Sequence, residues 1–73
     1  MAKDRLGPGY RVTEALLSDN SLGHAVIEVE YAQGTITLRG TVEFEEARLA
    51  AEALALEQEG VERVVNKLKS PIR

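Results

Sequence analysis

Two glycine-bounded segments decide the fold: Gly34-Thr-Ile-Thr-Leu-Arg-Gly-Thr-Val42 and Gly60-Val-Glu-Arg-Val-Val-Asn-Lys-Leu68. Both mix apolar residues with polar ones in alternation and are rich in β-branched residues, which is typical of strands with one buried face. An alanine-rich stretch, residues 44–58, lies between them and has apolar residues at helical spacing. We therefore predict two strands joined by a helix, the strands covering residues 35–42 and 63–69.

The segment before the first of these strands also alternates, and it predicts a β-hairpin. Residues 25–31 place three apolar side chains on one face and two glutamates on the other. Gly34 can adopt the positive φ that a tight two-residue turn requires. A slip of one residue would expose the whole apolar face, so the register is well determined. The expected pairs are Tyr31 with Ile36, Val29 with Leu38, and Glu28 with Arg39.

The N-terminal part predicts one further helix. Val12, Ala15 and Leu16 form an apolar stripe at helical spacing within residues 10–19, and we expect residues 1–9 to be a flexible arm. Residues 10–70 then form a single domain in the order α-β-β-α-β. The fold class is α+β, with a three-stranded mixed sheet and two helices packed on one face. On the second helix, the core-facing arc comprises Phe44, Ala47, Ala50, Ala51, Leu54 and Ala55.

Composition excludes several classes of protein. The chain has 73 residues, no cysteine and a net charge of −3. It can therefore form neither disulfides nor thiolate metal sites, and its charge argues against general nucleic-acid binding. RNA binding is further disfavoured, because no aromatic residues are interleaved with basic ones. Without an apolar span or a secretory signal in the sequence, we expect the chain in the cytoplasm or at the periphery of a membrane.

The residue types that carry catalysis are sparse, and we expect no catalytic site, metal or cofactor. His24 is the one histidine, and without a cysteine or a fixed carboxylate nearby it is best interpreted as a solvated turn residue. Ser18 and Ser21 have no partner base in the sequence pattern. The many glutamates follow helical surfaces, as expected for a solvated face rather than for an acid–base pair.

An apolar row on the second helix is the first candidate interaction surface. Leu49, Ala53 and Leu56 fall on the side opposite the core arc. An exposed row of this kind indicates a protein partner, a self-association seam or a lipid contact. The alternative is that these residues are simply strong helix formers, or that the first helix covers them.

A basic patch on the outer face of the sheet is the second candidate. By strand parity, Arg39, Arg63, Lys67 and Lys69 point away from the helices. They can face lipid phosphates or an acidic partner. In the alternative interpretation, Glu28 and Glu30 neutralise them in a cross-strand charge ladder.

The whole pattern resembles the BON domain, a small bacterial module first noted in osmotically induced and nodulation-related proteins. The resemblance covers about residues 10–69 and rests on four pieces in order: Val12 with Ala15-Leu16, Ile27-x-Val29, Gly34-x-Ile-x-Leu-x-Gly40-x-Val42, and Gly60-Val61-x-x-Val64-x-Asn66-x-Leu68. It implies a non-catalytic module that binds phospholipid or envelope-associated partners. The mixed sheet of this family implies that the third strand pairs directly with the second.

Three glycines and one asparagine have expected structural roles. Gly34 is assigned to the hairpin turn and Gly60 to the end of the second helix. Gly40 is expected on the inward face, where a helix would pack too closely for a side chain. Asn66 also points inward by parity, and we expect its amide to bond to the backbone. The leading hypothesis is phospholipid or partner binding, and the alternative is a protein–protein or self-association module acting through the second helix.

Overall fold

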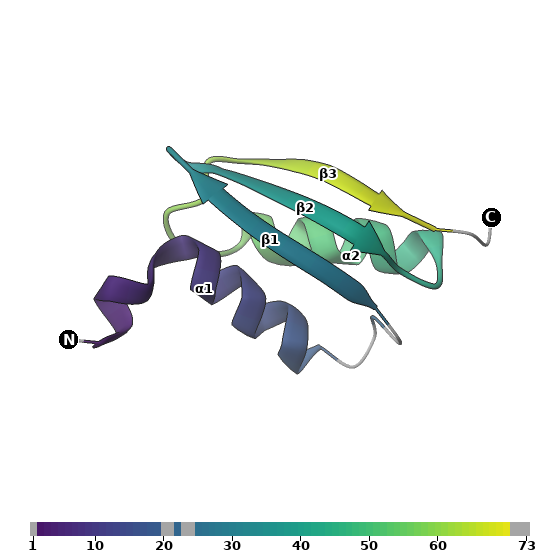
Figure 1. Ribbon diagram of the computed structural model, residues 1–73, viewed down its shortest axis with the longest axis horizontal. Helices are drawn as coiled ribbons and strands as arrows, with labels where there is room; N and C mark the ends of the chain where they lie inside the picture. The colour runs from purple at the N-terminus through teal and green to yellow at the C-terminus, as the bar shows by residue number, and fades with distance from the viewer. Residues whose placement is uncertain (1, 20–21, 23–24, 71–73) are drawn as a thin grey trace.

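The computed structural model describes residues 2–19, 22 and 25–70, with side chains from residue 7 onward. The chain forms two helices and three strands in the predicted order, and the α+β class is confirmed (Figure 1). The elements are α1 (Ala2–Ser18), β1 (Val26–Ala32), β2 (Thr35–Thr41), α2 (Glu45–Leu56) and β3 (Arg63–Lys69).

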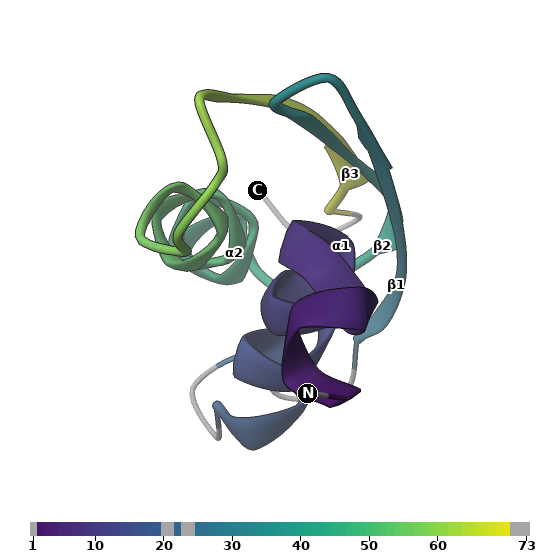
Figure 2. The same cartoon turned by 90° about the vertical axis from the view of Figure 1, so that its left-hand side faces the viewer.

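The strands form one mixed sheet in the order β1-β2-β3. β1 and β2 are antiparallel in the predicted register, including Val29 beside Leu38 and Glu28 beside Arg39. β3 runs parallel to β2, as the family resemblance implied. Both helices lie on the same side of this curved sheet, and no element among the described residues covers its other face (Figure 2).

The core lies between the sheet and the two helices. The central strand supplies two fully buried side chains, because Ile36 and Leu38 have neighbouring strands on both sides and helices beneath, and Val12 of α1 is buried to the same extent. On α2, a row of small residues lets the helix approach closely. The buried residues are Val12, Leu16, Leu22, Ile36, Leu38, Val42, Ala47, Ala51, Ala55 and Leu68. Phe44, expected in the core arc, is instead 42% exposed, because it is the N-cap residue before α2 rather than part of it.

The N-terminal boundary differs from the prediction. Helical backbone extends from Ala2, with a break at Gly7, whose φ of 70° and ψ of −176° are open only to glycine. The second helical part includes Pro8 and Gly9. Pro8 packs beside Gly60, because a Cβ added to Gly60 would lie 2.8 Å from the Cγ of Pro8. The prediction placed residues 1–9 in an arm and began the first helix at residue 10, whereas Pro8 and Gly9 lie within α1.

The predicted roles of two glycines need correction. Gly40 has a φ of +130°, and a Cβ there would collide with the carbonyl oxygen of Val26. The close approach is thus made by the backbone of β1, not by a helix. Gly60 does not cap α2 directly, because the helix ends at Leu56 and residues 57–60 form a turn. Gly34 is confirmed in the hairpin turn, with a φ of +81°.

Candidate binding surfaces

The predicted basic residues come together on the uncovered face of the sheet. Parallel pairing of β2 with β3 places Arg39 beside Lys67, and Lys69 lies two residues further along the same strand. Arg63 occupies the start of β3, beside Thr35. All four basic side chains belong to exposed residues, so strand parity predicted their orientation correctly.

Neutralisation of this basic patch is limited. Arg39 Nη2 lies 3.7 Å from Glu30 Oε1, and the two side chains are 50% and 59% exposed. An ion pair this open contributes little to stability, because water screens it. Its acidic partner is the diagonal neighbour Glu30, although the register places Glu28 directly opposite. Within residues 25–70, no ion pair joins Arg63, Lys67 or Lys69 to a carboxylate, so the charge-ladder interpretation applies to Arg39 alone.

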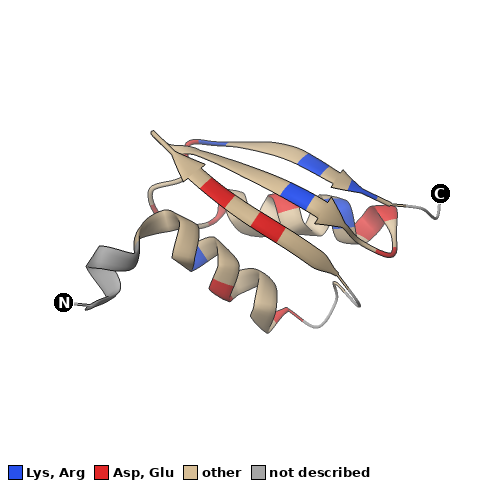
Figure 3. Cartoon of the chain, viewed as in Figure 1, with Lys and Arg blue, Asp and Glu red and all other residues tan. Residues whose placement is uncertain are grey.

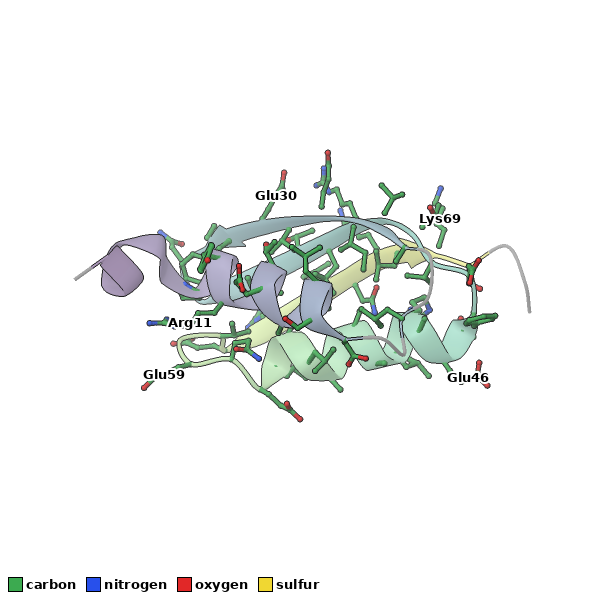
Figure 4. All side chains as sticks on the ribbon, turned by 90° about the horizontal axis from the view of Figure 1, so that it is seen from below. Arg11, Glu30, Glu46, Glu59 and Lys69 are labelled. Carbon is green, nitrogen blue, oxygen red and sulfur yellow. The ribbon has the colours of Figure 1, made fainter. Side chains whose placement is uncertain are left out.

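Charge is therefore divided across the sheet. The acidic residues Glu28 and Glu30 lie on edge strand β1, whereas the lysines lie on the opposite edge strand, β3 (Figure 3). Glu30 and Lys69 both project from the side of the sheet that the helices do not cover (Figure 4). One face thus presents an acidic edge and a basic edge, with Arg39 between them.

The apolar row on α2 is exposed. Leu49 and Leu56 are 51% and 48% exposed, and Ala53 between them is also exposed. The buried residues of this helix, Ala47, Ala51 and Ala55, lie on its other side. The alternative in which the first helix covers this row is therefore wrong.

Polar contacts link α2 to the sheet. Asn66 Nδ2 donates to the Arg48 carbonyl at 2.9 Å and to Glu52 Oε1 at 3.2 Å. Its Oδ1 accepts from the Leu68 N–H at 3.0 Å, so the prediction of a backbone-bonding asparagine is confirmed. Nearby, the hydrogen bond from the Arg48 guanidinium lowers the pKa of Glu45 and raises the pKa of Arg48 itself.

A hollow of about 160 Å³ lies between α1 and β1, and its lining contains the polar residues Thr13 and Asp19 as well as apolar side chains. Its walls include Leu16 and Leu17 from the helix and Ile27 and Val29 from the strand. Leu17 is 79% exposed, while Ile27 and Val29 are only partly buried. Sequence periodicity did not predict this hollow, because it depends on how closely α1 packs beneath the edge strand.

The described residues contain no cluster of three or more histidine, cysteine or acidic side chains able to hold a metal ion. The same part of the chain buries no polar or charged residue, and Ser18 is exposed at the end of α1. His24 and Ser21, which also belong to residue types used in catalysis, lie outside the described residues. Across the part that the structure describes, no helix is both long and apolar enough to cross a membrane.

These features define a small module of one mixed sheet and two helices, whose distinctive sites are charged and apolar surfaces. The BON domain family matches residues 11–70, which is most of the chain. The chain therefore belongs to the BON domain family, and the resemblance seen in the sequence is confirmed. Comparison with curated proteins gave no match.

Proposed function

We propose that this BON domain is a non-catalytic binding module that contacts anionic phospholipid surfaces through its basic patch. The observation that carries the proposal is the pairing of β2 with β3, which sets Arg39 beside Lys67 and continues to Lys69. Lys67 and Lys69 are exposed and have no carboxylate partner in the described part of the chain. Membership of a family associated with phospholipid and membrane-related partners supports the same target.

The charge division of the sheet determines how the module would approach a membrane. A basic residue near an anionic bilayer contributes about 1 kcal/mol, and an acidic one is repelled. The β3 edge would therefore face the lipid headgroups, while Glu28 and Glu30 on β1 stay further away. With so few charges, binding is expected to be weak and to decrease as salt shortens the screening length.

Co-sedimentation with vesicles tests this proposal. Vesicles of phosphatidylglycerol and phosphatidylcholine are expected to bind the chain at low salt, and vesicles of phosphatidylcholine alone are not. The double substitution Lys67→Gln and Lys69→Gln should lower the partition coefficient by up to about 30-fold, the equivalent of roughly 2 kcal/mol. Comparing Lys67→Gln with Arg11→Gln, the same change in charge on α1, separates patch binding from a net-charge effect. Equal losses in these two single variants, or no binding at low salt, would refute the lipid proposal.

A second candidate function is protein contact or self-association through Leu49, Ala53 and Leu56. It is favoured by the exposure of both leucines on one side of α2. Sedimentation velocity over a range of concentrations should then show an assembly that Leu56→Glu disrupts. Leu17→Glu is the matched control, because Leu17 is an exposed leucine on the other helix. A wild-type chain that stays monomeric at every concentration, with Leu56→Glu unchanged, would exclude this self-association.

A further inference from the structure

The outer edge of β1 offers backbone hydrogen-bonding groups to a further strand. β1 is an edge strand, and no other strand lies beside its outer side among the described residues. Ala32 and Thr35 flank the two-residue turn, so they form the hydrogen-bonded pair that closes the hairpin. Alternate residues then direct their N–H and C=O groups away from β2, and these are Ile27, Val29 and Tyr31.

The opposite edge of the sheet is less open. Leu68 on β3 donates its N–H to the side chain of Asn66, which occupies part of that edge. β3 also carries three basic residues, and charged side chains on an edge oppose pairing with similar strands. Of the two edges, β1 is thus the one available for strand addition.

Two features beside this edge indicate what it would accept. On the outer face, Glu28 and Glu30 are exposed, and Glu28 is in no ion pair within the described residues. On the helix side, Ile27 and Val29 are partly exposed above the hollow of about 160 Å³ that α1 leaves beside β1. A cavity of about 150 Å³ accommodates a benzene-sized group, so the volume of this hollow is sufficient for one aliphatic side chain against Leu16, Ile27 and Val29, with Thr13 and Asp19 also in its lining.

We propose that the β1 edge binds an extended peptide segment in which lysine or arginine alternates with aliphatic residues. In an added strand, alternate side chains point to opposite faces of the sheet. The basic side chains would meet Glu28 and Glu30, and the aliphatic ones would cover Ile27 and Val29 and enter the hollow. This site is independent of the lipid proposal, because it uses the acidic edge of the sheet rather than the basic one.

A designed peptide with this alternating pattern tests the site directly. The probe is acetyl-Thr-Lys-Val-Lys-Leu-Lys-Thr-amide, and its control has the same residues with the three lysines contiguous. In ¹H–¹⁵N NMR titrations at low salt, the probe should shift amides of residues 26–32 and slow the hydrogen exchange of the Val29 N–H. The contiguous isomer should bind more weakly, because its side chains cannot match both faces.

Protein and peptide variants separate charge from backbone pairing. Glu28→Gln with Glu30→Gln should weaken binding by about 3- to 30-fold, whereas Glu46→Gln with Glu59→Gln, away from this edge, should not (Figure 4). Methylating alternate peptide nitrogens in two complementary sets should abolish binding for only one set, since only one edge of the peptide faces β1.

Several outcomes would overturn the proposal. They are shifts centred on β3 or α2, equal binding of the two peptides, equal losses in the two glutamine variants, or equal effects of the two methylation sets. If diluting the protein alone changes the chemical shifts of the same β1 amides, the edge pairs with a second copy of the chain. That result would refute the proposal that the edge binds a separate peptide.

Discussion

At the scale of single residues, the positions that shape this domain act through backbone geometry and satisfied polar groups. Gly40 permits β1 to approach β2, because its φ of +130° and missing side chain leave room for the Val26 carbonyl. Asn66 links the sheet to α2 through the Arg48 carbonyl and bonds the Leu68 N–H of its own strand. Neither residue is placed to recognise a ligand, so substituting them should change stability rather than specificity.

Gly40→Ala is expected to destabilise the domain by at least about 2 kcal/mol. The added Cβ combines an unfavourable φ with a collision against backbone, which cannot move aside as a side chain could. Urea denaturation measures the free energy of unfolding. Gly9→Ala is the control, since Gly9 lies within α1 and its Cβ would meet Tyr31 Cβ at 3.3 Å, so its effect should stay within about 1 kcal/mol. Similar losses for both variants would contradict the role given to Gly40.

Some residue-scale details were predictable from the sequence, and others were not. The pairing of Glu28 with Arg39 followed from a two-residue turn and a period of two, both of which are local properties. The ion pair that forms joins Arg39 to Glu30, because long side chains reach diagonal neighbours as easily as direct ones. The reason for a glycine at position 40 could not be predicted either. Periodicity indicates which face of the strand residue 40 occupies, but not how closely the backbone of a neighbouring strand approaches it.

At the scale of elements, α2 begins with a favourable arrangement of charges. Glu45 and Glu46 occupy its first turn, where acidic side chains meet the positive end of the helix dipole. Arg48 Nε donates to Glu45 Oε1 at 3.0 Å, and this hydrogen bond lowers the pKa of Glu45. The stabilising contact is therefore linked to the charge of one carboxylate.

The pH dependence of this contact has a definite sign. Because the pKa of Glu45 is lower in the folded chain, its contribution to stability is fully present above the ordinary pKa of a glutamate carboxyl. The contribution is lost as pH falls through the lower folded value. NMR titration of the Glu45 carboxyl should show its pKa rising towards the ordinary glutamate value in Arg48→Met. An unchanged pKa in that variant would show that Arg48 is not the cause.

Element boundaries show where sequence reasoning stops. Strand β3 was predicted with the bounds observed. Gly60 and the alternation of apolar and polar residues after it are local signals, and they define this segment without tertiary information. The start of α1 was misplaced, because Gly7-Pro8-Gly9 contains residues that usually end helices. In the structure only Gly7 leaves helical geometry, and packing of Pro8 beside Gly60 holds the next turn in place. The hollow beside β1 depends on the same tertiary packing, which no local pattern encodes.

At the scale of the whole molecule, the topology separates acidic and basic residues across the sheet. An antiparallel hairpin followed by a parallel return places the acidic strand and the most basic strand at opposite edges of one sheet. We propose that the two edges serve different targets, anionic lipid at β3 and a basic extended segment at β1. The exposed row on α2 provides a third surface, which becomes important if the chain associates with itself.

Paramagnetic relaxation enhancement from spin-labelled headgroups in phosphatidylglycerol-containing nanodiscs tests the central claim most directly. If the basic edge contacts the lipid, amides of residues 63–69 should broaden most, those of β1 least within the sheet, and added salt should reverse the effect. Broadening centred on α2 or on β1, or none at low salt, would contradict the account.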